Sequence, residues 1–500
     1  MSYARGLKSV HRLGRESMEL TRRQLYVGGK WVAPSTGQYA EDLDPATNQP
    51  IAEVAVGGAE DAKAAVEAAR AAFENPEWRG MDPSKRGRLL YQLGQALRDA
   101  FEEVARLESL DVGKPIREAK GDAAFVYKTF EYWAGMADKI QGETIPVPGA
   151  RLDYTLREPV GVTVHIAPWN YPLTLACRGI APALAAGNTV VLKPAAITPL
   201  TALKLAELGE KAGLPPGVLN VVTGPGSTVG KALATHPDVS SITFTGSLET
   251  GRQILEMASK HVTPVTLELG GKNPNIVFPD ADLDRALKSV LFAAFQNAGQ
   301  MCWSGSRLLV HESVHADFVK KVVERAARMK LGPGLKEDTQ MGPVVSKEQE
   351  KSVLSYVDVG AGEGAKLLVG GKKVTDGELA AGNFLAPAVF DGVTPDMRIA
   401  REEIFGPVLS AMSFKTVDDL IDAANAVEYG LAAGVWTKDL KTAHTVAARL
   451  QAGMVSINEF PLTFPQTPFA GWKRSGLGHE QGLDAIRFYT RLKNVNVNLD

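Results

Sequence analysis

Two cysteines are the residues of this sequence best suited to covalent chemistry. Cys177 and Cys302 are the only ones in 500 residues, and they form no CxxC pair, which excludes a disulfide framework or a zinc ribbon. Cys302 lies in FQNAGQMCWSGSR, where Gly299 and Gly305 would let a ligand approach the backbone closely. A lone thiol can be a nucleophile in a reducing compartment, but it is more often a small buried apolar group. The local sequence therefore leaves Cys302 open, and we expect Cys177 to lie in the core.

A segment around residue 246 could bind a phosphate group. Thr245-Gly246-Ser247 follows an apolar strand candidate and opens a helical segment. Free N–H groups and the dipole at such a helix end favour a pyrophosphate, but Ser247 could equally serve only as a helix cap. Upstream glycines form GxGxxxG over residues 224–230, one residue longer than the usual dinucleotide-binding spacing, and are weak evidence for a cofactor.

The segment His311-Glu312-Ser313-Val314-His315 matches the zinc-protease pattern HExxH. That pattern binds metal only when both histidines lie on one face of a single helix. Here RLLVH is typical of a strand, and Ser313 is expected to cap the following helix, so the two rings should diverge. We therefore expect no metal site.

The elements that would position these residues alternate in type. Residues 25–56 predict short strands, and residues 59–136 predict helices with a break at 113–115. Apolar strand candidates and helical segments then alternate from 159 to 280, and a second αβ series follows. This alternation is typical of βαβ units and a parallel sheet with both faces covered.

Composition limits the kinds of partner. A chain of 500 residues is too long for one compact core, and its 45% hydrophobic and 22% charged residues are ordinary for globular domains. A formal net charge of -2 offers no reason to expect nucleic acid or an anionic membrane as partner. No apolar run reaches the roughly 18 residues that span a bilayer.

The first residues, MSYARGLKSVHRLGRES, are basic but lack the apolar core of a secretory signal. An organelle presequence is conceivable because no acid precedes Glu16. We favour a frayed tail and expect the protein to be cytoplasmic.

Several motifs in order give the sequence a family resemblance. They are PWNYPL (168–173), KPA (193–195), FTGS (244–247), LELGGKNP (267–274), GQMC (299–302), EEIFGPV (402–408) and PFAGWKRSGLGHE (468–480). In these motifs the chain resembles the aldehyde dehydrogenase superfamily along nearly its whole length. The resemblance implies an NAD(P)-dependent enzyme that oxidises a small-molecule aldehyde to a carboxylic acid.

The resemblance also implies roles for individual residues. Cys302 would attack the aldehyde carbon, Asn170 and the backbone N–H of Cys302 would bind the developing oxyanion, and Glu268 would activate the water that hydrolyses the thioester. The cofactor-binding residues that it implies are Trp169, Lys193, Ala196, Gly246, Ser247, Glu403 and Phe405.

Three departures from the family pattern stand out. Many NAD-preferring members have an acid where this chain has Ala196, and that acid repels a 2′-phosphate. Its absence leaves NADP open beside NAD. Ala470-Gly471 replaces a glycine pair, and His479 replaces the usual Arg; both affect fine packing rather than the chemistry.

The substrate stays open between two classes. Arg178 could hold the carboxylate of a semialdehyde acid, as in some family members, or could pair with a protein acid. Gln296 stands where succinic-semialdehyde members have a second Arg. Tyr171, Trp303 and Phe464 would instead line an apolar tunnel for aromatic or longer aliphatic aldehydes.

The resemblance implies an α/β fold of three parts. A Rossmann-like NAD(P)-binding domain would comprise 1–139 and 160–270, a catalytic αβ domain 271–480, and a small β oligomerisation arm 140–159 and 481–500. The arm would build a homodimer or homotetramer. Two rivals are a CoA-acylating semialdehyde dehydrogenase, which typically lacks the base Glu268, and a catalytically idle relative, which the intact Cys302, Glu268 and Asn170 disfavour.

Overall fold

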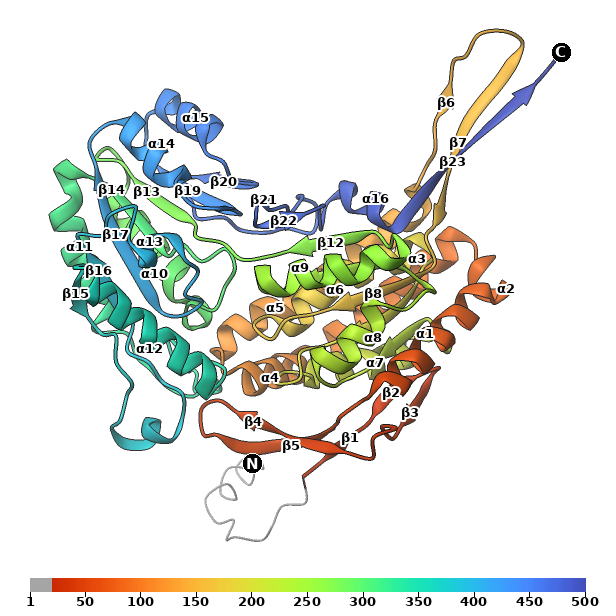
Figure 1. Ribbon diagram of the computed structural model, residues 1–500, viewed down its shortest axis with the longest axis horizontal. Coiled ribbons are helices and arrows are strands. Elements are labelled where there is room, and N and C mark those ends of the chain that lie inside the picture. The colour runs from red at the N-terminus through yellow and green to blue at the C-terminus, as the bar shows by residue number, and fades with distance from the viewer. Residues whose placement is uncertain (1–19) are drawn as a thin grey trace, which may run out of the picture.

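The computed structural model describes residues 20–500, and the basic N-terminal segment considered above lies outside the described residues. The chain forms two α/β halves side by side, with a narrow β arm that projects from one of them and ends near the C-terminus (Figure 1). Each half has its own hydrophobic core.

The first half is built on an eight-stranded sheet in the order β22-β12-β11-β8-β9-β10-β2-β3. Its five central strands run parallel, and antiparallel strands close both edges. The strands are β2 (Leu25–Val27), β3 (Lys30–Val32), β8 (Val162–Ile166), β9 (Thr189–Lys193), β10 (Leu219–Val221), β11 (Val239–Thr245), β12 (Val265–Glu268) and β22 (Gly476–Leu477). The sheet is therefore mainly parallel, as the strand pattern from 159 to 280 predicts, and Rossmann-like, as the family resemblance implies.

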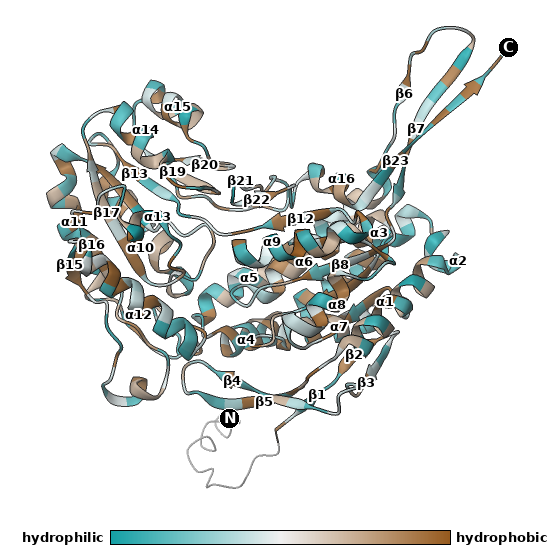
Figure 2. Ribbon diagram, in the orientation of Figure 1, coloured by the Kyte–Doolittle hydropathy of each residue, from teal (hydrophilic) through white to brown (hydrophobic). Residues whose placement is uncertain are grey.

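Helices cover both faces of this sheet, because successive side chains of its strands point to opposite faces and both sets are apolar. Val190 and Leu192 pack with the α3–α7 side, and Val191 packs with α1, α8 and α9. Figure 2 shows the hydrophobic residues concentrated on these inner strands. The helices are α1 (Ala59–Glu74), α2 (Pro76–Arg79), α3 (Pro83–Asp99), α4 (Phe101–Val112), α5 (Ile116–Met136), α6 (Pro172–Ala186), α7 (Leu200–Lys211), α8 (Lys231–Ala234) and α9 (Leu248–Ala258).

The second half is built on a seven-stranded sheet in the order β15-β16-β17-β14-β13-β19-β20, of which only the edge strand β15 is antiparallel. The strands are β13 (Pro274–Val277), β14 (Arg307–His311), β15 (Lys366–Val369), β16 (Ala388–Asp391), β17 (Val408–Phe414), β19 (Ala432–Trp436) and β20 (Met454–Ile457). The helices are α10 (Leu283–Phe295), α11 (Glu312–Ala326), α12 (Lys347–Gly362), α13 (Arg398–Arg401), α14 (Val417–Asn425) and α15 (Leu440–Arg449).

The two sheets are joined by a short buried connection. β12 ends at Glu268 in the first sheet, and β13 begins at Pro274 in the second. The edge strand β22 differs from expectation, since residues 476–477 fall in the range assigned to the catalytic domain but pair with β12. A two-residue strand that returns from the end of the chain carries no periodicity by which a sequence could reveal it.

The arm is a three-stranded antiparallel sheet in the order β23-β7-β6. Its strands are β6 (Thr144–Ile145), β7 (Arg151–Pro159) and β23 (Thr490–Asn498), and β7 pairs with β23 along its full length. Residues 481–489, expected in the arm, instead include α16 (Ile486–Tyr489), whose Tyr489 is buried in the first core. Smaller sheets are formed by β1 (Arg22–Arg23), β4 (Tyr39–Asp44) and β5 (Gln49–Ala55), and by β18 (Tyr429–Gly430) with β21 (Trp472–Lys473).

The HExxH segment spans the end of a strand and the start of a helix, as the strand-like residues RLLVH predict. β14 ends at His311 and α11 begins at Glu312. The expected cap at Ser313 is wrong: His311 is the N-cap, and its Nδ1 accepts from the N–H of Ser313. His315 lies within hydrogen-bonding distance of Asp391. Among residues 20–500, no group of three or more His, Cys, Asp or Glu side chains could hold a metal ion.

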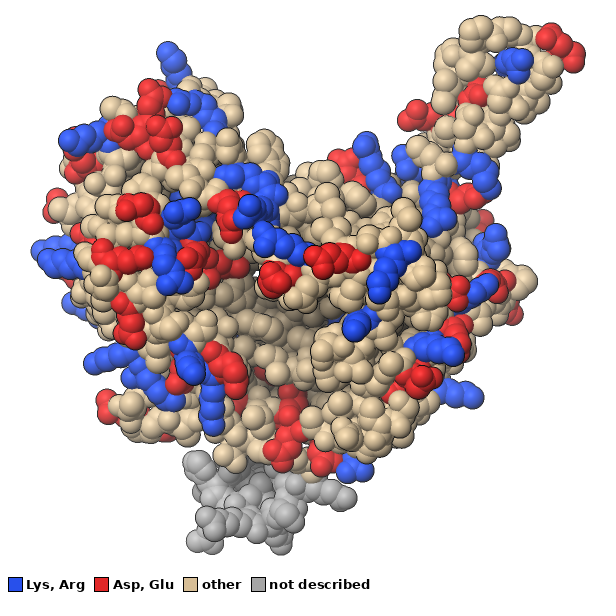
Figure 3. Space-filling model, viewed as in Figure 1, with Lys and Arg blue, Asp and Glu red and all other residues tan. Residues whose placement is uncertain are grey.

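The surface carries no extended area of one charge on the face in Figure 3, where acidic and basic side chains are interspersed. Within residues 20–500, none of the helices has both the length and the apolar character needed to cross a membrane.

Candidate active site

The site lies at the carboxyl edge of the parallel strands of the first sheet. The register places Ile166, Lys193, Thr245 and Glu268 at the ends of neighbouring strands. From β8 the chain continues through β9 and β10 on one side, and through β11 and β12 on the other. Ligands of open α/β sheets bind at such a switch point, outside the carboxyl ends of the strands. Trp169 and Asn170 follow β8, and Gly246 and Ser247 follow β11, so these residues border the crevice.

The loop that carries Cys302 comes from the second half and has an unusual backbone. Asn297, Ala298 and Gly299 are consecutive residues in the left-handed region, with φ of 48°, 54° and 72°. Such conformations are costly for residues with a side chain and persist only where the surroundings hold them. This run ends α10 abruptly and brings Cys302 back toward the first sheet.

Hydrogen bonds tie this loop to Asn170. The buried Asn170 donates from Nδ2 to the carbonyl of Gln300 at 2.9 Å, and its own carbonyl accepts from Asn297 Nδ2 at 2.9 Å. On the other side, Asn273 Nδ2 donates to the carbonyl of Cys302 at 2.9 Å. An amide nitrogen has two N–H groups, so Asn170 has a second N–H besides the one that binds Gln300, and Asn170 and Cys302 line a common cavity.

Cys302 lies where two cavities meet, because it lines both of them. Burial raises the pKa of its thiol to about 12, and Arg178 opposes this rise while Glu403 and Glu268 add to it. The thiol is therefore predominantly protonated in the free protein. Cys177 is buried in the core, and burial raises its pKa well above the ordinary value.

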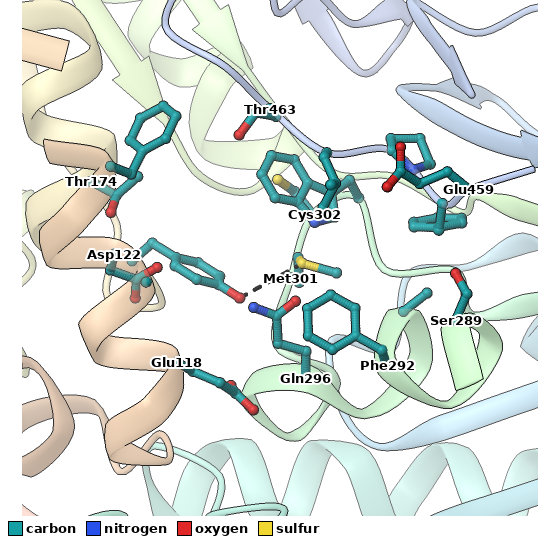
Figure 4. A pocket seen from close by; sticks show the side chains of 18 of the residues that line it. Glu118, Asp122, Thr174, Ser289, Phe292, Gln296, Met301, Cys302, Glu459 and Thr463 are labelled. Carbon is teal, nitrogen blue, oxygen red and sulfur yellow. Dashed lines mark hydrogen bonds between the residues drawn. The ribbon is translucent and has the colours of Figure 1, made fainter. Parts of the chain in front are cut away.

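The larger cavity has a volume of about 680 Å³. Three of the residues expected in a substrate pocket, Tyr171, Arg178 and Trp303, line it, as does Gln296. Figure 4 shows Phe292, Gln296 and Met301 around Cys302, with Glu118 and Asp122 approaching from α5. The aromatic residues that line this larger cavity, besides Tyr171 and Trp303, are Phe125, Phe292, Trp436 and Phe460.

Phe464, expected in the wall of this cavity, lies outside it and is 52% exposed. A turn in which Thr467 donates to the carbonyl of Phe464 directs this part of the chain outward. Residues 458–463 line the cavity instead. No local signal distinguishes these residues from Phe464, because only the path of the loop decides which of them face inward.

The smaller cavity, of about 240 Å³, contains most of the residues expected at a cofactor. Trp169, Gly246, Ser247, Glu403 and Phe405 line it. The rings of Trp169 and Phe405 meet edge to face with centroids 5.1 Å apart. The carboxylate of Glu403 accepts from the N–H of Gly271 at 3.0 Å, and a Cβ at Gly270 would lie 2.1 Å from its other oxygen.

These features fit a dinucleotide. The start of α9 presents N–H groups for phosphate, Glu403 can accept from ribose hydroxyls, and the aromatic pair offers an apolar wall for a flat ring. Ser247 is also the N-cap of α9, since its Oγ accepts from the N–H of Thr250 at 3.2 Å. Both of the roles considered for Ser247 are therefore compatible with its position.

Lys193 and Ala196 lie outside the lining of this cavity. Lys193, at the end of β9, donates to the carbonyl of Pro194, and burial lowers its pKa to about 8. Its side-chain carbons lie 3.7 and 3.8 Å from the Cβ position of Gly230, so the 224–230 segment borders it. Ala196 is exposed in the turn that follows β9.

Glu268 is buried, and neither of its side-chain oxygens has a hydrogen-bond partner in the protein. Burial raises its pKa well above the ordinary value, nearby Glu480 raises it further, and Arg178 lowers it. A carboxylate held in this way binds a proton more readily than one in water, which suits a general base.

Arg178 pairs with a protein acid. Its guanidinium forms an ion pair with Glu480, both side chains are 1% exposed, and the guanidinium lies 3.9 Å from the centroid of the Phe469 ring. Sequence reasoning left this pairing open against a substrate carboxylate, and it did not select Glu480. The partner comes from the far end of the chain, so no spacing could reveal it.

The protein has a parallel α/β fold with a thiol between two cavities. This arrangement is that of an enzyme in which two bound molecules meet at one nucleophile. The chain belongs to the aldehyde dehydrogenase family, whose model matches residues 31–495. Betaine aldehyde dehydrogenase from Bacillus subtilis is 47% identical over 95% of this chain and 97% of that protein. Hydroxyisobutyraldehyde dehydrogenase from Mycolicibacterium austroafricanum is also 47% identical, over 95% of this chain and 94% of that protein.

Solved structures agree over the whole fold. Betaine aldehyde dehydrogenase from Staphylococcus aureus in complex with NAD+ is similar with a TM-score of 0.95 and 40% identity, covering 96% of both chains. An NAD+ complex of aldehyde dehydrogenase from Bacillus cereus has a TM-score of 0.94 and 42% identity, covering 96% of this chain and 97% of that one. The protein is thus an aldehyde dehydrogenase by family, and the family resemblance deduced from its motifs is confirmed.

The raised pKa of Cys302 predicts how the thiol of the free protein reacts. A thiol of pKa about 12 gains roughly tenfold in thiolate for each pH unit between 7 and 10, whereas an ordinary thiol of pKa ~8.5 saturates. We expect the rate of iodoacetamide addition, followed by mass spectrometry, still to rise at pH 10. Cys302→Ala should abolish this labelling, and a plateau below pH 9 would contradict the burial effect.

Proposed function

We propose that this protein oxidises an aldehyde to a carboxylic acid through a thioester on Cys302. The observation that carries the proposal is the position of Cys302 between the two cavities, next to Asn170 and within the electrostatic influence of Glu268. One cavity suits the aldehyde and the other the dinucleotide, so the thiol can meet both.

In the first stage, the thiol of Cys302 loses its proton to solvent, the resulting thiolate attacks the aldehyde carbon, and the carbonyl oxygen becomes an alkoxide. The free N–H of Asn170 Nδ2 and the backbone N–H of Cys302 stabilise this oxyanion. A nicotinamide cofactor held by the residues of the smaller cavity would supply the acceptor for the hydride that leaves the former aldehyde carbon. A thioester then remains on Cys302.

In the second stage, Glu268 takes a proton from a water molecule that attacks the thioester carbon. The carbon–sulfur bond breaks, the acid leaves, and Cys302 is regenerated. The presence of Glu268 favours hydrolysis over acyl transfer to CoA. An intact nucleophile, base and oxyanion donor favour catalysis over an idle role.

For the substrate, we infer an aldehyde without a carboxylate. Arg178 is paired with Glu480 and stacked on Phe469, so binding a substrate carboxylate would require breaking a buried ion pair. Gln296 supplies no positive charge at its position, and six aromatic side chains line the cavity, together with the charged Arg117, Arg285 and Lys288. Neither betaine aldehyde nor hydroxyisobutyraldehyde, for which the relatives are named, is a semialdehyde acid.

We also propose that the protein forms a homodimer or homotetramer through its arm. The arm projects from the body (Figure 1), and leucines on both long strands are exposed, with Leu156 at 42% and Leu492 at 60%. Its outer strand β23 leaves one edge open, which a second chain could pair with or cover. A cytoplasmic location fits the free thiols of both cysteines.

An aldehyde panel tests the function. We expect NAD(P)H formation with aromatic or aliphatic aldehydes, at a higher kcat/KM than with succinic semialdehyde. Cys302→Ala should abolish the activity because no other group can form the acyl-enzyme, whereas Cys177→Ala should keep substantial activity. Activity that survives in Cys302→Ala would overturn the mechanism, and a preference for succinic semialdehyde would overturn the substrate class.

Glu268→Gln separates the two stages. The amide cannot take a proton from water, so we expect a rapid first turnover of NAD(P)H formation followed by a steady state slowed about a hundredfold or more. Stopped-flow absorbance measures both phases. An equal fall of burst and steady rate would argue against Glu268 acting mainly in hydrolysis.

We propose that cofactor choice depends on Ala196, in the turn that follows β9. The NAD+ complexes of similar proteins support NAD as a cofactor. The side chain of Ala196 has no acidic group that would repel the 2′-phosphate of NADP. We therefore propose activity with both NAD and NADP. Ala196→Glu should shift preference toward NAD by about tenfold to a hundredfold, the effect of a like-charge contact of roughly 1–3 kcal/mol. Ala196→Gln controls for size, and complete rejection of NADP by the natural protein would refute the dual use.

A further inference from the structure

Glu118 connects the first half of the molecule to the catalytic loop of the second. It is a buried residue in the first turn of α5, and its Oε2 accepts from the backbone N–H of Asn297 at 2.9 Å. The two residues are 179 positions apart in the chain. Asn297 is the first of the left-handed residues that turn the chain toward Cys302.

Asn297 also forms hydrogen bonds to Asn170 and Gln300, which adjoin the catalytic groups. Its side chain donates to the carbonyl of Asn170 at 2.9 Å, and its carbonyl accepts from Gln300 Nε2 at 2.9 Å. The carbonyl of Gln300 in turn accepts a hydrogen bond from Nδ2 of Asn170. Asn297, whose backbone N–H binds Glu118, is therefore bonded both to Asn170, the proposed oxyanion donor, and to Gln300, two residues before Cys302.

The position of Glu118 is itself determined by a buried charge cluster. Lys114, at the corner between α4 and α5, has no exposed side-chain surface and forms ion pairs with Glu108 at 3.4 Å and Asp122 at 2.7 Å. Its ammonium also lies 3.9 Å from the centroid of the Tyr171 ring. The N–H of Ile116 donates to the carbonyl of Gly334 at 2.8 Å. These contacts restrict the first turn of α5 from several sides.

We propose that Glu118 is a positioning residue for acylation, which acts by holding Asn297 in its left-handed conformation and so placing Asn170 and Cys302. The inference rests on the proposed function. Glu118 also lines the larger cavity, where its second oxygen lies 3.8 Å from Arg117 Nη2. It acts through a hydrogen bond to the loop, and its negative charge is not needed for that bond.

A pair of variants separates the hydrogen bond from the charge. Glu118→Gln keeps an oxygen that can accept from Asn297, with its amide nitrogen facing the cavity, whereas Glu118→Ala removes the acceptor. We expect Glu118→Ala to slow the burst of NAD(P)H formation by about tenfold to a hundredfold, and Glu118→Gln to restore it to within a few-fold of the natural protein. The KM for the cofactor should change little, because Glu118 does not line the smaller cavity.

Asp61→Ala is the matched control, since Asp61 is a buried carboxylate of the first half that accepts from the N–H of Gly58 and the hydroxyl of Ser35 but lines neither cavity. It should lower the melting temperature but leave the burst rate close to that of the natural protein. An equal loss of burst rate in Asp61→Ala and Glu118→Ala would overturn the proposal, because general destabilisation would then explain both. So would a Glu118→Gln variant as slow as Glu118→Ala.

Alkylation of Cys302 in the free protein gives a second readout that needs no aldehyde turnover. We expect Glu118→Ala, but not Glu118→Gln or Asp61→Ala, to change the iodoacetamide rate at least several-fold, because the thiol moves relative to its charged neighbours. Unchanged alkylation in Glu118→Ala would overturn the positioning role even in a protein that oxidises none of the aldehydes. A change without aldehyde oxidation would support the role of Glu118 and reject the proposed function.

Discussion

The hydrogen bond from Asn170 to the carbonyl of Gln300 joins the two halves of the molecule at the site of chemistry. Asn170 follows a strand of the first sheet, and Gln300 precedes Cys302 in the second half. Most of what the site can do depends on this junction, because the thiol and the dinucleotide crevice belong to different halves. The left-handed backbone at 297–299 is the conformational cost of bringing them together.

Buried charge is the second constraint on the site. Arg178 lies near both Cys302 and Glu268 and lowers the pKa of each, against the larger effect of burial. The ion pair with Glu480 holds the guanidinium of Arg178 in place and compensates its positive charge. Burial thus shifts both the thiol of Cys302 and the carboxyl group of Glu268 toward their protonated forms relative to the same groups in water. A bound substrate and cofactor, by changing the charge and hydration around them, can then shift these equilibria toward the reactive forms.

The regular part of the fold could be predicted well because its signals are local. The alternation of apolar strand candidates and helical segments from 159 to 280 predicts a parallel sheet, and the structure has the five parallel strands β8 to β12 in this region. The elements that were missed or misplaced are short or irregular. The strand β22, the cap at His311 and the path of the loop at Phe464 depend on contacts with distant segments.

The sequence and its family motifs pointed to the chemical groups at the site: one thiol in a glycine-rich loop, one glutamate at the end of a strand candidate and one amide after another, with the HExxH segment interpreted as a strand and a helix that bind no metal. Motif order was enough for the family, because each motif keeps its residue types and spacing. Tertiary structure alone decided that Arg178 faces Glu480, that Glu118 reaches Asn297, and that Cys302 lies between two cavities. These contacts join residues more than a hundred positions apart, and only the packing of the two sheets brings such residues within a few ångströms of one another.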